Sequence, residues 1–334
     1  MRIEFAGGIV NRLYCRQFFS RSAVLFFALA MFSLAACGRR PATMSEAIQA
    51  VRSGDVEAVK SFLNDNSDLV FSRDCEGNTL LHFAAAKGQK DIASILLANN
   101  AAVDARGTNG MTPLHWAANN GHTDMAKFLL ANKAAIDAKE IYGMTPLQFA
   151  SVKNLIQVVS VLVASNADVN AKSKDGMTPL HIAATYGNKD VAEFLLLHHA
   201  NVNARINGGE TPLHAAALND HKNVAELLIS AKAEIEAREQ NGGTPLHFAA
   251  VKGCVDIAGL LLSNKAAVNS TNIFGWTPLH AAAKSGQKDF VSFLLANKAD
   301  VNAVNSEGQT PLGLAVKNEH NDVAELLRQY GGHE

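Results

Sequence analysis

The chain has 334 residues, of which 48% are hydrophobic and 18% charged, with a mean hydropathy of +0.02. These values exclude a disordered chain and a bundle of membrane helices and indicate a packed protein. Lys and Arg number 30 against 31 Asp and Glu, so the strongly basic signature of a general nucleic-acid-binding protein is absent. Four cysteines are too few for a disulfide-dense scaffold.

The amino-terminal segment has the pattern of an export signal. Arg12, Arg16 and Arg21 precede an uncharged apolar run over residues 23–36, which falls short of the roughly 20 residues that span a bilayer but has the length of a signal-peptide core. The run ends in Leu-Ala-Ala-Cys at Cys37, which resembles the lipobox of bacterial lipoproteins. The resemblance implies cleavage after residue 36 and acylation of Cys37. We therefore expect a signal peptide over residues 1–36 and a membrane tether over residues 37–44.

In that lipoprotein family, a residue other than Asp after the cysteine favours the outer membrane of Gram-negative cells, and here it is Gly38. The resemblance thus implies an exported, membrane-anchored lipoprotein, on the periplasmic face of the outer membrane or at the cell surface. An uncleaved signal anchor with a fortuitous cysteine remains the alternative, because the 21-residue basic region is long for a signal peptide.

The rest of the chain is periodic, with a threonine every 33 residues. A glycine stands two positions before each threonine, which predicts a tight turn with positive φ. After the threonine the usual sequence is Pro-Leu-His, except that Leu80 replaces the first proline and Gln148 the third histidine. Threonine is a good N-cap and proline suits the first helical position, so each motif predicts a helix start. The threonines are residues 79, 112, 145, 178, 211, 244, 277 and 310.

Each predicted helix is short, because nine residues after the threonine stands a glycine suited to a left-handed C-cap. Asn154, Asp220 and Glu319 replace that glycine in three repeats, and we expect them to adopt the same conformation at a higher cost. A second helix with apolar residues at helical spacing follows, as in residues 124–130. Before the next threonine lies an extended, hairpin-like segment.

Helix, turn, helix and projecting hairpin at this period, with the full motif Thr-Pro-Leu-His-Trp-Ala-Ala at residues 112–118, resemble the ankyrin repeat. The resemblance covers residues 45–334 and implies an all-α solenoid, a curved right-handed stack of about nine repeats. Eight repeats extend from about 77 to 333. A divergent cap repeat over 45–76 precedes them, in which Ser45 takes the place of the threonine and Gly54 keeps the frame. Terminal repeats of a solenoid require a polar outer face.

The histidines of the repeat motif invite a catalytic or metal-binding interpretation, but each sits where its side chain can reach back to the turn and satisfy backbone groups. His198 and His199 lie together at a helix end without any recognised metal-ligand spacing. No nucleotide-binding or hydrolase motif occurs. We therefore expect no enzyme activity, no metal and no cofactor. The six motif histidines are residues 82, 115, 181, 214, 247 and 280.

Two further features have a structural and a functional interpretation. Cys75 and Cys254 lie five repeats apart, too far for a bridge within one molecule, so each is a tolerated thiol or pairs with a partner protein. Basic residues six before most threonines form a ladder that either belongs to the repeat framework or steers an acidic partner. The ladder residues are Arg73, Arg106, Lys139, Lys172, Arg205 and Arg238.

The ankyrin resemblance implies protein recognition on the concave face, through positions one, three and four before each threonine and seven and eight after it. Read across the array, these positions give a central and a smaller second cluster of apolar side chains, the residue types found at interface hot spots. Met or Trp directly before the motif also packs within ankyrin stacks. The candidates are Met111, Ile141, Tyr142, Met144, Met177 and Tyr186 in the first cluster and Ile273, Phe274 and Trp276 in the second.

The sequence thus predicts a membrane-tethered, monomeric, non-enzymatic protein-binding module whose partners are an unidentified protein and, through Cys37, the bilayer, with no nucleic acid. Two other functions remain open: a structural spacer of the cell envelope without a specific partner, and an exported effector acting on host proteins. We also expect the third clear repeat to be the least stable internal one, because of Gln148, Asn154 and the valine-rich stretch 158–163.

Overall fold

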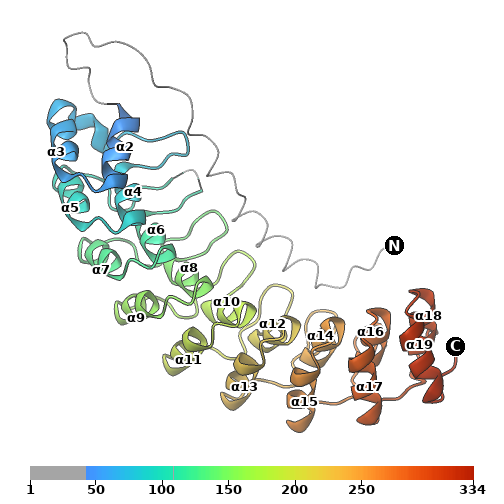
Figure 1. Ribbon diagram of the computed structural model, residues 1–334. Coiled ribbons are helices and arrows are strands. Elements are labelled where there is room, and N and C mark those ends of the chain that lie inside the picture. The colour runs from blue at the N-terminus through green and yellow to red at the C-terminus, as the bar shows by residue number, and fades with distance from the viewer. Residues whose placement is uncertain (1–42, 108) are drawn as a thin grey trace. The chain divides into compact units, whose positions relative to one another are not determined.

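The computed structural model describes residues 43–107 and 109–334. Within them the chain forms 18 α-helices, arranged as nine consecutive pairs stacked in chain order (Figure 1). The first helix of each pair contacts the first helices before and after it, and the second helices form a parallel row behind them. The predicted signal peptide over residues 1–36 and the predicted acylation site Cys37 fall outside the described residues. The fold is therefore the all-α solenoid that the repeat predicts.

The first helices, which we call the inner helices, are short because a cap stands at each end. They are α2 (Met44–Ser53), α4 (Leu80–Lys87), α6 (Pro113–Asn119), α8 (Pro146–Val152), α10 (Pro179–Tyr186), α12 (Pro212–Leu218), α14 (Pro245–Lys252), α16 (Pro278–Lys284) and α18 (Pro311–Lys317).

The second helices, which we call the outer helices, are α3 (Val56–Asp65), α5 (Lys90–Ala98), α7 (Thr123–Ala131), α9 (Ile156–Ala164), α11 (Lys189–Leu197), α13 (Lys222–Ser230), α15 (Val255–Ser263), α17 (Lys288–Ala296) and α19 (Asn321–Gln329). A short 3-10 helix, η1 (Ser67–Val70), follows α3.

The predicted helix boundaries of the repeats are confirmed. Each repeat threonine is the N-cap of its inner helix. Asn154, Asp220 and Glu319 adopt positive φ of 55°, 59° and 63°, as the glycines at the equivalent positions do. A second left-handed residue, 21 after each threonine, ends the outer helix and was not predicted; His199 is one of them, with φ of 66°.

The cap repeat begins earlier than the sequence pattern predicts. Thr43, not Ser45, is the N-cap of α2, because the backbone N–H of Glu46 donates to the Thr43 hydroxyl while the Glu46 carboxylate accepts from Thr43 N–H at 2.8 Å. This reciprocal capping box fixes the start two residues upstream, so α2 is longer than the other inner helices. Gly54 ends it with φ of 77°, as the frame requires.

The hydrophobic core runs between the two rows of helices. It consists mainly of the leucine two positions after each threonine, the following small alanines, and the apolar stripe of the outer helices. Ala117 and Ala118 are fully buried against neighbouring inner helices, and their small side chains permit close helix packing. At the last repeat α19 turns Asn321, Asp322 and Glu325 to solvent, the polar outer face expected of a solenoid cap.

The connecting segments project from the same side of the stack as hairpin-shaped loops (Figure 1), but no β-strand is assigned in the described part of the chain. Neighbouring tips share one backbone hydrogen bond each, for example from Ile141 N–H to the Asn109 carbonyl at 3.0 Å and from Lys174 N–H to the Tyr142 carbonyl at 2.9 Å. The hairpin-like segments that the sequence predicts are turns with hairpin shape, each closed by a backbone bond such as that from Glu140 N–H to the Met144 carbonyl at 3.1 Å.

Candidate protein-interaction surface

The buried motif histidines connect each repeat to the next. In every one, the backbone N–H of the capping threonine donates to Nδ1 at 3.0–3.3 Å. Since Nδ1 must accept, the proton lies on Nε2, which donates to a carbonyl 29 residues further along the chain at 2.9–3.2 Å. The backward bond was predicted; the forward bond requires the neighbouring repeat and was not.

Burial keeps these rings neutral. Desolvation lowers the pKa of His115, His181 and His247 to about 4 and that of His214 to about 3. With both ring nitrogens engaged by the backbone, these imidazoles have no position from which to bind a metal or exchange protons with a substrate. Their geometry supports the structural interpretation, in which the rings hydrogen-bond each repeat to the next.

Gln148 performs the same function in the third clear repeat. Its Oε1 accepts from Thr145 N–H at 2.9 Å and its Nε2 donates to the Met177 carbonyl at 2.7 Å. The substitution therefore removes neither bond, and Asn154 supplies the left-handed turn. Two of the three reasons for expecting a weak third repeat lose their force, and the valine-rich α9 remains.

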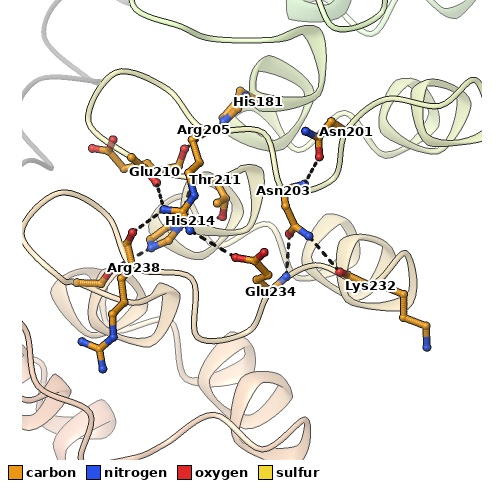
Figure 2. Close-up of polar contacts among 12 residues, drawn as sticks. His181, Asn201, Asn203, Arg205, Glu210, Thr211, His214, Lys232, Glu234 and Arg238 are labelled. Atoms are coloured by element: carbon orange, nitrogen blue, oxygen red, sulfur yellow. Dashed lines mark hydrogen bonds and ion pairs between the residues drawn. The ribbon is translucent and has the colours of Figure 1, made fainter.

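The basic ladder also belongs to the framework (Figure 2). Arg205 Nη1 donates to the Arg238 carbonyl at 2.6 Å and to the Gly209 carbonyl at 3.1 Å, while its Nη2 lies 3.4 Å from a carboxylate oxygen of Glu234. Each of the other five side chains likewise donates to the carbonyl 33 residues ahead. These bonds fix the side chains along the stack, although carbonyl acceptors leave their positive charges in place.

A third set of side chains joins the repeats at the foot of the hairpins. Asn203 Oδ1 accepts from Glu234 N–H at 2.8 Å (Figure 2), and the residue at this position in six other repeats makes the same bond. Histidine, ladder and this acceptor together make adjacent repeats one rigid unit. The hairpin tips and the exposed ends of the inner helices are thereby held in fixed positions for recognition.

Of the nine predicted contact residues, three are exposed: Ile141 at 42%, Tyr186 at 37% and Ile273 at 64%. Four others are half-buried and belong to the hairpins: Met111, Tyr142, Met177 and Phe274.

Met144 and Trp276 are corrected by the structure. Their side chains are only 7% and 8% exposed, whereas Met111 and Met177 at the same repeat position are half-buried. Trp276 lies under the ammonium of Lys284, 5.0 Å from the ring centroid. Met144 and Trp276 offer little surface to a partner, so the candidate surface is reduced to the other seven residues.

The sequence analysis overlooked the charge of this surface. At positions seven and eight after the threonines stand five lysines and no Asp or Glu. Residues 43–334 as a whole carry 24 Lys and Arg against 30 Asp and Glu. The positive charge at these positions is therefore opposite in sign to the net charge of residues 43–334. A count by repeat position would have found it. We call this set the inner-rim lysines: Lys87, Lys153, Lys252, Lys284 and Lys317.

The described residues hold no group of three or more His, Cys, Asp or Glu side chains placed to share a metal ion. Cys75 is exposed, whereas Cys254 is buried at the start of α15, where burial raises the pKa of its thiol to about 12. No helix in residues 43–107 or 109–334 has the length and apolarity needed to cross a membrane.

A family model described as ankyrin repeats (3 copies) matches the chain over residues 47–140, 133–206, 198–272 and 260–334. These overlapping matches cover most of the sequence and all but the first helix turn of the described stack. The chain therefore belongs to the ankyrin repeat family, whose repeats generally mediate protein–protein interaction. A comparison with curated proteins finds no match.

Proposed function

We propose that the chain is a membrane-tethered, non-enzymatic protein-binding module. It recognises a partner protein through the face formed by the hairpin tips and the exposed ends of the inner helices. The observation that carries this proposal is exposed apolar surface on a rigid framework. Ile141, Tyr186 and Ile273 are exposed at family binding positions, while buried bonds between repeats hold the backbone beneath them. Apolar and aromatic side chains fixed in this way pay little entropy on binding.

The chemistry of the array supports a binding function over catalysis. Its six motif histidines are kept neutral by burial and bond to the backbone through both ring nitrogens, and Cys254 is a buried thiol. Exposed apolar residues at recognition positions also favour a binding function over a spacer without a partner, because a spacer has no need of them.

The tether rests on the sequence Leu34-Ala35-Ala36-Cys37 after an apolar run. Acylation at Cys37 would anchor the mature chain durably, since each buried CH₂ contributes about 0.8 kcal/mol. Metabolic labelling with a fatty-acid probe should mark the protein, and Cys37→Ala should lose the mark. A label of unchanged intensity in that variant contradicts the tether and leaves the binding function untouched.

The binding function is tested by affinity purification from gently solubilised membranes of the producing cells. We expect a stoichiometric partner protein that is retained by the wild-type chain and lost with Tyr142→Ala. Recovery of no partner under cross-linking conditions favours the spacer, and a partner from a host cell alone favours the exported effector.

A further inference from the structure

The face that we propose for protein binding has a distinctive charge. All charged residues at positions seven and eight after the threonines are inner-rim lysines. The exposed Lys87 and Lys153 stand one repeat before and one repeat after Asn120, at the same repeat position. The outer helices differ, since α5, α7, α11, α15 and α17 each carry an aspartate at their second residue, beside a lysine at the first residue of α5, α11 and α17. The C-terminal ends of the inner helices therefore carry only positive charge, whereas the outer helices carry both signs.

Lysines flank the apolar residues of the central repeats directly. Lys153 at the end of α8 and Tyr186 at the end of α10 hold the same position in adjacent repeats, and these two helices pack against each other. At the hairpin tips Lys174 N–H donates to the Tyr142 carbonyl at 2.9 Å, so Lys174 and Tyr142 are neighbours as well. Each of the two tyrosines thus has an exposed lysine beside it.

The buried carboxylate of Glu140 lies close enough to Lys174 to interact with its charge, but it is turned into the hairpin tip. Glu140 is 4% exposed, and its Oε1 accepts from Tyr142 N–H at 2.8 Å and from Met144 N–H at 2.9 Å. Its Oε1 therefore holds the backbone of the hairpin tip. The ladder adds Arg106, Lys139 and Lys172 along the base of the same hairpins, where their donors meet only neutral carbonyls.

We propose that the partner of this face is an acidic protein segment, which places carboxylates against Lys153 and Lys174 and apolar side chains against Tyr142 and Tyr186. This inference rests on the proposed binding function and adds the chemistry of the partner. Carboxylates meet the lysines by charge complementarity, which raises the association rate and selects among partners. A nucleic acid fits less well, because a phosphate backbone requires continuous positive charge, whereas exposed Asp175 directly follows Lys174 at the tip.

The test uses the full-length chain in mild detergent and fluorescein-labelled peptides in anisotropy titrations. The acidic probe has four glutamates on each side of one tryptophan, and two matched probes carry lysines or serines instead. A labelled deoxythymidine oligonucleotide represents nucleic acid. We expect the glutamate probe to bind at least about tenfold more tightly than the other three at low salt, and to weaken strongly when salt shortens the Debye length to a few ångströms.

The matched variants locate the site. Lys153→Glu with Lys174→Glu should weaken binding of the glutamate probe by at least about tenfold. Lys90→Glu with Lys189→Glu makes the same charge change at exposed positions on outer helices and should stay within about twofold. If the first pair lowers the melting temperature, Lys153→Gln with Lys174→Gln gives the same comparison without introducing negative charge at a helix end.

Three results overturn the inference: tighter binding of the oligonucleotide, equal binding of the serine and glutamate probes, or equal loss in the two variant pairs. None of these refutes the proposed protein-binding function, which the purification from solubilised membranes tests separately.

Discussion

The forward bond of the motif histidines makes a quantitative prediction at His214. The ring is 0% exposed; Thr211 N–H donates to its Nδ1 at 3.1 Å, and its Nε2 donates to the Gly243 carbonyl at 3.1 Å (Figure 2). His214→Ala leaves the buried Thr211 N–H without a partner and removes one of two hydrogen bonds to the Gly243 carbonyl, which still accepts from Glu239 N–H at 3.0 Å. An orphaned buried donor costs about 1–3 kcal/mol and a lost hydrogen bond about 0.5–1.5 kcal/mol, so the variant should lose about 1.5–4.5 kcal/mol of unfolding free energy.

A natural control comes from the third clear repeat, where Gln148 makes both bonds. His214→Gln should therefore cost less than about 1.5 kcal/mol, as expected of a replacement that keeps both contacts and most of the volume. The assay is urea unfolding followed by circular dichroism, with hydrogen exchange of residues 211–252 to show that the loss reaches both repeats. Equal losses for the alanine and glutamine variants, or a loss below about 1 kcal/mol for alanine, refute the bridging function.

Three further predictions concern the whole array. Because burial lowers the pKa of the motif histidines below the ordinary value of 6.5, to about 4 for His115, the unfolded chain binds more protons, and stability should fall as the pH is lowered from 6.5 to about 4; a urea midpoint that rises over this range contradicts it. Hydrogen exchange should be faster in residues 145–165 than in 178–198, because α9 carries four valines, which are weak helix formers. In addition, Leu155 stands at the repeat position of Asn188, whose side chain donates to the Ser151 carbonyl at 2.7 Å, and leucine has no such donor. Equal protection of the two segments contradicts this prediction. In native protein, maleimide should modify Cys75 and spare Cys254, whose buried thiol has a pKa of about 12; mass spectrometry showing rapid labelling of Cys254 refutes its burial.

The sequence predicts the fold closely because motif residues mark the helix boundaries within each repeat. In the eight clear repeats, a threonine that is followed by proline in all but the first marks the start of the inner helix and a left-handed residue marks its end, so even Glu319 at φ of 63° follows from the 33-residue frame. What it does not predict depends on the neighbouring repeat: the forward bond of His115 to the Met144 carbonyl, the ladder bonds and the bonds between tips. Spacing along one chain says nothing about a contact that forms only when two repeats stack.

The candidate surface was predicted in position and only partly in composition. Family position identifies exposed Ile141, Tyr186 and Ile273. It fails for Met144 and Trp276, which are buried, although Met111 and Met177 at the same repeat position are half-buried. Only the burial seen in the structure distinguishes exposed from buried candidates. The structure also shows the reciprocal contact with Glu46 that makes Thr43 the N-cap.

The most direct test of the binding face compares substitutions of exposed apolar residues on two different faces of the array. Ile141→Ser with Tyr142→Ala alters the hairpin tip of the proposed face, whereas Leu197→Ser removes an apolar side chain that is 72% exposed at the end of outer helix α11. Both variants and the wild-type chain are used to purify bound protein from the same solubilised membranes, with quantitative mass spectrometry as the readout. Binding through the tips and inner helices predicts loss of the partner with the first variant, by at least about fivefold for a hot-spot loss of 1 kcal/mol, and full retention with the second. Loss of the partner with Leu197→Ser and retention with the tip variant would place recognition on the outer face and contradict the proposal.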